Sequence, residues 1–328
     1  MARVIRLHRH GGPEVLAVET VPDAPPRAGE VRIRHLAIGV NFTDVHGRRG
    51  DYAELAAAKK PVGIGIEAMG TVEALGAGVT RLRIGDRVAY ASRPLGSYCD
   101  ARNYPADLCA KVPAGIADEI VAASFLKGMT VEYLIRRTYP VKTGDTVVFH
   151  AAAGGVGLIA GQWLKALGAH AIGIVGSLEK SAVALKAGYA QVFVHGRDDW
   201  PAEVRKRTGG RGVPAVFDSV GQATWEGSIA CLAPRGRMVC FGNSSGIVPP
   251  ISINMLRDRG SLWATWTRLS EYTETVAELE ACAATFFDAL RAGQVQPSIH
   301  KTFPLDDAAG AHRLLESRQT TGSLVLIP

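Results

Sequence analysis

The stretch from Thr146 to Gly157, TVVFHAAAGGVG, constrains the fold more than any other part of this chain. It opens on β-branched and aromatic residues, which are typical of a buried parallel strand. A turn of alanine and glycine follows, and apolar residues then recur at helical spacing until Gly168. The order of strand, tight turn and helix predicts a dinucleotide-binding βα unit, in which the Gly-x-Gly-x-x-Gly pattern occurs as Ala152-x-Gly154-x-x-Gly157.

Small residues in such a turn let a diphosphate approach the backbone, and the free N–H groups at the start of the helix bind it. We therefore expect cofactor contacts from this turn, namely from Ala152, Gly154, Gly155, Val156 and Gly157. The alternative is a Gly/Ala-rich turn in some other α/β protein. The flanking strand and helix favour the dinucleotide site.

From Thr146 onward, strand-like and helix-like segments alternate. We expect strands near 146–150, 170–175, 191–195, 214–219, 236–241 and 260–265, and helices near 155–167, 178–187, 198–208 and 222–232. Strands that alternate with helices of about ten residues predict a doubly wound parallel sheet with right-handed crossovers. The carboxyl ends of such strands bind ligands.

The rest of the chain has a different pattern. Residues 1–123 contain short apolar runs between Gly, Pro and Asp turns, which predict a small β-rich, barrel-like domain. Helical patterning begins near Asp118 and continues to Leu134. After a Rossmann domain over 124–266, we expect the tail 267–328 to return to the first domain through helices at 270–292 and 305–318 and a strand at 323–326.

Composition excludes several classes of protein. The 328 residues include 37 basic and 31 acidic side chains, and this excess is too small and too scattered to require a nucleic-acid partner. No apolar run reaches about 18 residues, so no membrane span is expected. The five cysteines are odd in number and widely spaced, and the first residues lack the apolar core of a signal peptide, which together favour reduced thiols and a cytoplasmic location.

Several separate blocks give the chain a resemblance to a known family. Over essentially its whole length it is similar to the zinc-free quinone oxidoreductases (zeta-crystallin type) of the medium-chain dehydrogenase/reductase superfamily. The blocks are Asn41-Phe42-Thr43-Asp44 with Arg48 and Tyr52, Pro61–Gly70, Phe125–Thr130, His150–Gly157, Asp218–Gly221, Phe241–Ser245, Leu315–Arg318 and Gly322-Ser323. The resemblance implies a GroES-like catalytic domain beside the Rossmann domain, and a homodimer joined edge to edge at the nucleotide sheets, for which Gly246–Met255 is the candidate edge.

The resemblance also bears on zinc. Alcohol dehydrogenases of the superfamily have a cysteine ligand where this chain has Asn41 and a histidine where it has Ile66. Their structural zinc lobe carries four clustered cysteines, whereas only Cys99 and Cys109 lie in that region here. Because zinc needs three or four N, S or O ligands in a tetrahedral array, we expect no metal. A quinone or a carbonyl conjugated to a C=C bond is a strong electrophile that needs less activation.

The end of the second Rossmann strand indicates the cofactor. NAD-selective enzymes carry an acidic residue there, about 20 residues after the glycines. This chain has Gly176 and Ser177, followed by Lys180, and a hydroxyl and an ammonium suit a 2′-phosphate. Glu179 argues against this, and the alternative is that Ser177 only caps the next helix. We expect NADPH.

The resemblance places further residues at the site. It implies catalytic or nicotinamide-side roles for Asn41, Tyr52 and Thr130, and His46 stands where the family has tyrosine. An imidazole could pass a proton near neutral pH. Three of these residues have a plain alternative: a turn asparagine for Asn41, a packed tyrosine for Tyr52 and a solvent-facing histidine for His46. The other residues expected at the cofactor are His195, Ser219, Phe241, Gly242, Asn243, Ser244, Thr265, Trp266 and Arg318. His195 could instead be structural, and Trp266 could belong to the core.

The function implied is reduction of quinones or related α,β-unsaturated carbonyls by NADPH without zinc. A 2-enal or enoyl-thioester reductase would keep the cofactor site and change the substrate pocket. A different class, an RNA-binding or structural crystallin-like protein, has only the pI of about 9.1 in its favour.

Overall fold

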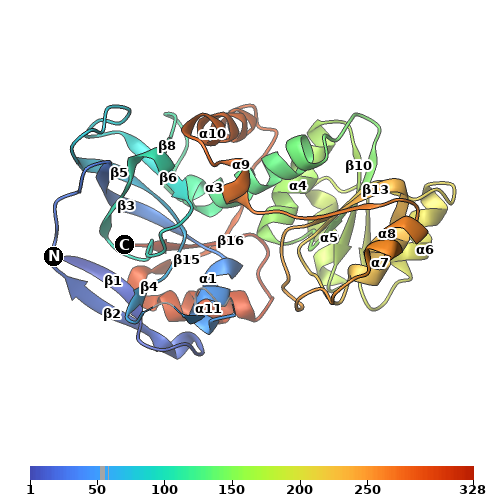
Figure 1. Ribbon diagram of the computed structural model, residues 1–328, viewed down its shortest axis with the longest axis horizontal. Helices are drawn as coiled ribbons and strands as arrows, with labels where there is room; N and C mark the ends of the chain where they lie inside the picture. Colours follow the sequence, from blue (N-terminus) through green and yellow to red (C-terminus); the bar gives the residue numbers. More distant parts are fainter. Residues whose placement is uncertain (52–55, 58) are drawn as a thin grey trace. The chain divides into compact units, whose positions relative to one another are not determined.

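The structure is a computed structural model that describes residues 1–51, 56–57 and 59–328 (Figure 1). The chain forms two compact units. We call the first the β-rich unit; it comprises Met1–Lys127, Thr273–Phe287 and Pro297–Pro328. The second, the Rossmann unit, comprises Gly128–Tyr272 and Asp288–Gln296. The expected divisions after residues 123 and 266 lie a few residues before those of these units.

The Rossmann unit contains the parallel sheet that the alternating pattern predicted. Its six strands have the order β11-β10-β9-β12-β13-β14, and every neighbouring pair is parallel. This is the doubly wound order, which reverses at β9 and so opens the sheet to a ligand at that point. The strands are β9 (Thr146–His150), β10 (His170–Val175), β11 (Gln191–Val194), β12 (Val213–Asp218), β13 (Leu232–Cys240) and β14 (Trp263–Trp266).

The expected ranges contain the helices α4 (Gly155–Ala166), α5 (Glu179–Lys186), α6 (Trp200–Arg207) and α7 (Trp225–Cys231). The unit also has a helix that was not expected, α8 (Ile253–Asp258). Strand β13 begins at Leu232, four residues before its expected start, and its register with β12 shifts between Val213 and Ala215. Arg235, in the left-handed region at φ 63°, gives β13 a local kink that the apolar pattern does not reveal.

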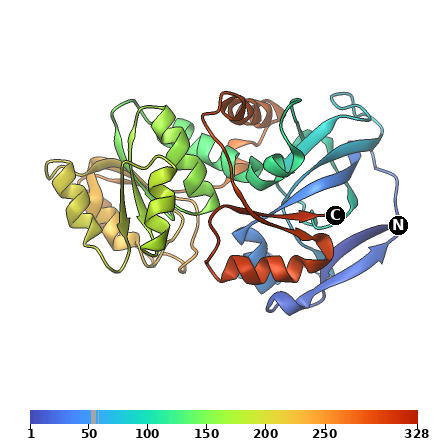
Figure 2. The same cartoon turned by 180° about the vertical axis from the view of Figure 1, so that it is seen from behind.

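The β-rich unit is built on two sheets. The larger has the order β15-β16-β3-β5-β6-β8, with β7 also paired to β3, and the smaller has the order β2-β1-β4. The strands are β1 (Ala2–Leu7), β2 (Leu16–Val21), β3 (Glu30–Val40), β4 (Val62–Gly63), β5 (Glu67–Leu75), β6 (Arg87–Ala91), β7 (Ala101–Pro105), β8 (Ala110–Lys111), β15 (Ile299–Pro304) and β16 (Ser323–Ile327). Because β16 pairs with β3, the end of the chain completes this sheet, as the red C-terminal strands in Figure 2 show.

Helix α1 (Phe42–Arg49) follows β3 directly in this unit. Helix α3 (Asp118–Tyr133) begins in this unit and ends in the Rossmann unit, where a π-helical turn, η3 (Leu134–Thr138), follows it. Near the end of the chain, the 3₁₀ turn η4 (Leu305–Asp307) leads into α11 (Ala308–Glu316). Two further 3₁₀ turns are η1 (Pro13–Val15) and η2 (Ala106–Leu108).

The prediction of a single helix over 270–292 is wrong. The chain instead forms α9 (Leu269–Tyr272) and α10 (Val276–Arg291). Thr275 and Glu278 form a capping box, in which the Thr275 N–H donates to the Glu278 carboxylate over 3.0 Å and the Glu278 N–H donates to the Thr275 hydroxyl over 3.2 Å. These two bonds satisfy the first N–H groups of α10 and so start a new helix there. Across the described residues, no helix is long and apolar enough to cross a membrane.

Candidate active site

The turn after β9 has the geometry of an anion-binding loop. Helix α4 begins at Gly155 with Gly154 as its N-cap, so the first N–H groups of the helix have no intrahelical acceptor. A Cβ on Gly157 would lie 2.3 Å from the carbonyl oxygen of Ala151, which excludes any larger residue there. Ala152 tolerates its methyl group because that group packs against Gly173 on β10, where a Cβ would lie only 2.8 Å away.

A residue that the sequence interpretation missed supports this turn. The Tyr189 hydroxyl donates to the carbonyl oxygen of Gly157 over 2.8 Å, and the ring of Tyr189 lies against Gly161. Tyr189 is 3% exposed and burial raises the pKa of its hydroxyl well above the ordinary value, so it acts as a neutral donor. The sequence interpretation missed Tyr189 because this residue lies far from the glycines in sequence.

At the end of β10, Gly176 has open space around the position of a Cβ. The Ser177 hydroxyl donates to Glu179, and this hydrogen bond lowers the pKa of the Glu179 carboxyl. Ser177 does not occupy the N-cap of α5, which is Leu178. Lys180 is the second residue of α5, so the hydroxyl and the ammonium expected at the 2′-phosphate stand on one short segment.

The loops after β12 and β13 lie together at the carboxyl edge of the sheet. Asp218 holds the first loop: its Oδ1 accepts the Val220 N–H over 2.7 Å and the Gly221 N–H over 3.1 Å. Two hydroxyl groups donate to its Oδ2, from Thr224 over 2.7 Å and Ser228 over 2.9 Å. Asp218 is fully buried and acts on the site only through this loop.

The expected residues of these loops contact one another. The Phe241 N–H donates to the carbonyl oxygen of Asp218 over 2.9 Å, and the Ser244 N–H to that of Ser219 over 3.2 Å. A Cβ on Gly242 would lie 2.9 Å from the Ser219 carbonyl oxygen, so the loops approach too closely for a side chain. The buried Oδ1 of Asn243 has no hydrogen-bond partner in the described part of the chain, which leaves an acceptor for a ligand.

Four other expected cofactor residues stand at or just after the ends of strands or helices. His195 follows β11, donates its N–H to Val175, and has a buried Nδ1 with no partner among described residues. Thr265 and Trp266 end β14, and Trp266 is 43% exposed, so the alternative that it packs in the core is wrong. Arg318 follows α11 with a positive φ of 59° and is exposed.

Asn41 is held at the start of α1 in the β-rich unit. Its N–H donates to Asp44 Oδ2 over 2.8 Å, and its side-chain Nδ2 donates to Glu67 Oε2, also over 2.8 Å. Glu67 is completely buried at the start of β5, and its Oε1 accepts the Leu126 N–H over 2.6 Å. Burial raises the pKa of Glu67, and the Lys127 ammonium 3.7 Å from its Oε2 opposes that rise.

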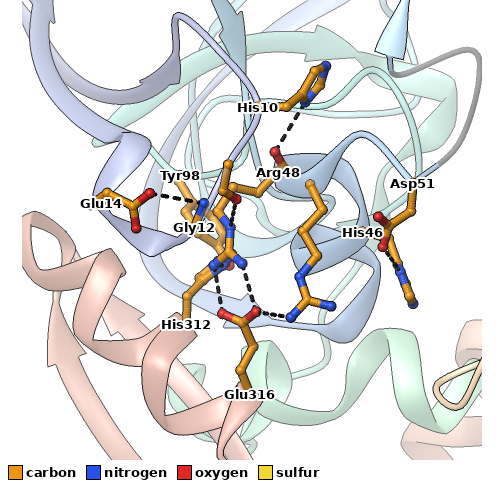
Figure 3. A network of polar contacts seen from close by, with 11 residues as sticks. His10, Gly12, Glu14, His46, Arg48, Asp51, Tyr98, His312 and Glu316 are labelled. Carbon is orange, nitrogen blue, oxygen red and sulfur yellow. Dashed lines mark hydrogen bonds and ion pairs between the residues drawn. The ribbon is translucent and has the colours of Figure 1, made fainter.

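Asp44 connects Asn41 to a longer polar network. The Tyr98 hydroxyl donates to Asp44 Oδ2 over 3.0 Å and lies 3.1 Å from His312 Nε2. His312 Nδ1 accepts from Arg48, which also makes a two-bond ion pair with Glu316 at 2.7 and 2.8 Å, as Figure 3 shows. Burial lowers the pKa of His312 to about 3, so the ring is neutral and relays hydrogen bonds rather than charge.

The remaining expected catalytic residues have different outcomes. His46, on α1, has its Nδ1 2.7 Å from the Asp51 carboxylate, so it is a paired side chain (Figure 3). Thr130 is a buried residue of α3, one turn after Lys127 on the same face of the helix. Tyr52 lies outside the described residues. Glu67 and Lys127 were not singled out from the sequence, although both stand inside blocks that carry the family resemblance.

These features fit a dinucleotide. The first turn of α4 suits a diphosphate, and the unpartnered atoms of Asn243 and His195 are at strand ends where such a ligand binds.

For metal ions, residues 1–51, 56–57 and 59–328 contain no group of three His, Cys, Asp or Glu side chains placed to hold one.

Known proteins match this chain over its full length. The family model described as alcohol dehydrogenase GroES-like domain matches residues 27–141, and the one described as zinc-binding dehydrogenase matches 155–281. Quinone oxidoreductase 1 of Escherichia coli is 47% identical, and a 2-haloacrylate reductase of Burkholderia sp is 42% identical; the matches cover all of this chain and 100% and 99% of those proteins. The crystal structure of E. coli quinone oxidoreductase complexed with NADPH matches with a TM-score of 0.96 at 45% identity over the whole of both chains.

Because the identity extends over the whole chain, and because Asn41 and Ile66 replace two zinc ligands, the chain belongs to the zinc-free quinone oxidoreductase branch (zeta-crystallin type) of the medium-chain dehydrogenase/reductase superfamily.

Proposed function

We propose that this chain reduces quinones, or related α,β-unsaturated carbonyls, with NADPH and without zinc. The observation that carries the proposal is the Asn41 amide held by the buried Glu67 at the position where zinc-dependent relatives have a metal ligand. The full-length similarity to quinone oxidoreductases, one of them crystallised with NADPH, supports it.

Some residues of this chain bind the cofactor, and Asn41 stabilises charge on the substrate. The first turn of α4 binds the diphosphate, and the loops that Asp218 holds bind the nicotinamide end. When bound, the nicotinamide supplies the hydride. The amide of Asn41 has two N–H groups and gives one to Glu67, so the other is available to a substrate carbonyl oxygen. That donor stabilises the negative charge that develops on the oxygen.

Selectivity for NADPH over NADH rests on Ser177 and Lys180 in this proposal. Replacing Lys180 by alanine should raise the KM for NADPH about tenfold and leave the KM for NADH unchanged, because only the 2′-phosphate needs the ammonium. Lys186, at the other end of α5, provides the matched control. Equal effects on both cofactors would contradict the assignment.

The test of the proposed function is a set of steady-state rates with NADPH and NADH over a panel of quinones, enals and a 2-haloacrylate. We expect the highest kcat/KM with a quinone. A 2-haloacrylate or an enal as the best substrate would favour the second candidate, which the similarity to 2-haloacrylate reductase supports. No turnover, together with salt-sensitive RNA binding, would support the nucleic-acid class instead.

We also propose a homodimer joined at the free edge of the Rossmann sheet. The sheet has β11 at one edge and β14 at the other, and we assign the contact to β14, because the expected Gly246–Met255 contains no strand before α8 begins at Ile253. On β14, Trp263 is 65% exposed, and an exposed apolar edge strand is a ready template for pairing. A light-scattering mass of 34.8 kDa, that of one chain, would rule the dimer out.

A cytoplasmic location is part of the same proposal. All five cysteines are buried thiols, and burial raises the pKa of Cys99 and Cys109 to about 12, so neither forms a reactive thiolate. Cell fractionation tests the location directly.

A further inference from the structure

The ammonium group of Lys127 is buried, and none of the described residues accepts a hydrogen bond from it. The side chain is 9% exposed, and its Nζ has no hydrogen-bond partner in the described part of the structure. Glu67 Oε2 lies 3.7 Å away, which is ion-pair distance but too long for a hydrogen bond. Three unmet donors on a buried cation are costly, so a ligand atom is the natural acceptor at this position.

Other contacts hold the Glu67 carboxylate at this distance of 3.7 Å from Lys127 Nζ. Its Oε1 accepts the Leu126 N–H, and its Oε2 accepts the Asn41 amide. The carboxylate is also confined by Gly39 on β3, where a Cβ would lie 2.2 Å from Oε2. Asn41 Nδ2 and Lys127 Nζ therefore converge on one fixed oxygen, and each retains donors that point elsewhere.

We propose that Lys127 donates a hydrogen bond to the same substrate oxygen as Asn41, and that Glu67 is the positioning residue that holds both groups. This rests on the proposed function, which assigns a carbonyl substrate to Asn41. As a hydride adds to the conjugated system, negative charge collects on that oxygen. A fixed ammonium in a buried site stabilises this charge, which is the role a metal ion has in zinc-dependent relatives.

The competing explanation is that Lys127 only balances the buried charge of Glu67. Removing one partner of a buried ion pair leaves an uncompensated charge, whereas replacing both keeps the site neutral. We therefore compare Lys127→Met, Glu67→Gln and the double variant that carries both substitutions. Lys127→Arg keeps the charge, and Lys111→Met removes a lysine of a surface ion pair as the matched control.

If Lys127 acts on the substrate, Lys127→Met lowers kcat for quinone reduction at least about tenfold while the dissociation constant for NADPH changes little. The double variant regains thermal stability but remains as slow, and Lys127→Arg recovers part of the rate. A double variant that regains the wild-type kcat would overturn the proposal, because charge balance would then explain everything.

A second measurement does not depend on turnover. The anion of 4-nitrophenol resembles a reduced quinone, and its absorbance reports ionisation when it binds the complex with NADP⁺. We expect the bound phenol to ionise at a pH about one unit lower in the wild type than in Lys127→Met, because the ammonium stabilises the anion. Equal apparent pKa values, or no binding by the wild type, would overturn the proposal. Failure of the proposed function would appear separately, as no NADPH oxidation by the wild type with any quinone.

Discussion

Replacing Asp44 by asparagine should remove a stability cost that grows with pH. Asp44 is 2% exposed, and its Oδ2 accepts the Asn41 N–H and the Tyr98 hydroxyl. Its Oδ1 has no hydrogen-bond partner among the described residues and borders a cavity of about 10 Å³. An asparagine oxygen can accept both existing hydrogen bonds, so the substitution changes the charge and preserves the contacts.

The magnitude follows from the protonation equilibrium of Asp44. Burial raises the pKa of this carboxyl from 3.8 to about 7, so the folded protein binds the proton more tightly than the unfolded chain does. Stability from this group is therefore fully present below pH 3.8 and is lost as the pH rises through 7. A difference of roughly three in pKa corresponds to about 4 kcal/mol, an upper bound because the site can relax.

The assay is urea unfolding of the wild type and Asp44→Asn between pH 4.5 and 8.5, since the difference between them cancels all other titrating groups. The free energy of unfolding of the variant minus that of the wild type should rise by up to about 1.4 kcal/mol per pH unit below pH 7. Above pH 7 this difference should stay constant. Asp86→Asn is the control of opposite sign: partial burial would raise the pKa of Asp86, but the Lys111 ammonium and Arg83 together outweigh burial and lower that pKa. A difference that stays constant with pH for Asp44→Asn would refute the reasoning.

Three other predictions test single contacts. Gly39→Ala would place a methyl group 2.2 Å from Glu67 Oε2 and 2.3 Å from a backbone oxygen, so kcat should fall about tenfold or more while NADPH affinity, measured by fluorescence titration, is retained. Gly157→Ala would place a methyl group 2.3 Å from a backbone carbonyl oxygen of the phosphate turn, and NADPH should bind at least about tenfold more weakly in the same titration, whereas unchanged affinity would contradict the turn geometry. His46→Phe removes the contact with Asp51, and we expect an altered pH–rate profile for quinone reduction; an unchanged profile would contradict the expectation that this imidazole passes a proton to the substrate.

Local sequence was sufficient for the Rossmann sheet. Each strand there is a short apolar run next to a Gly or Asp turn, and each helix has its own apolar period, so neighbours in sequence carry the whole signal. The expected absence of zinc came from the family resemblance together with residue chemistry, because an amide at Asn41 and an alkyl group at Ile66 cannot replace a thiolate and an imidazole as ligands. Tertiary structure was not needed for either inference.

Contacts across the sheets required the tertiary structure. Glu67 lies opposite Gly39 because β3 and β5 pair in one register, and that register brings the carboxylate to Asn41 and within 3.7 Å of Lys127. No sequence period reports which residue faces which across two strands. The break between α9 and α10 was missed because its two-residue capping box interrupts an otherwise continuous apolar pattern.

The sequence by itself predicted where a dinucleotide binds and, through the family resemblance, which metal ligands are missing, because both depend on the residues of one short segment or on the identity of single side chains. Only the tertiary structure showed which buried groups meet. The charges of Glu67 and Lys127 and the unpaired oxygen of Asp44 acquire their properties from burial and from partners far away in the chain.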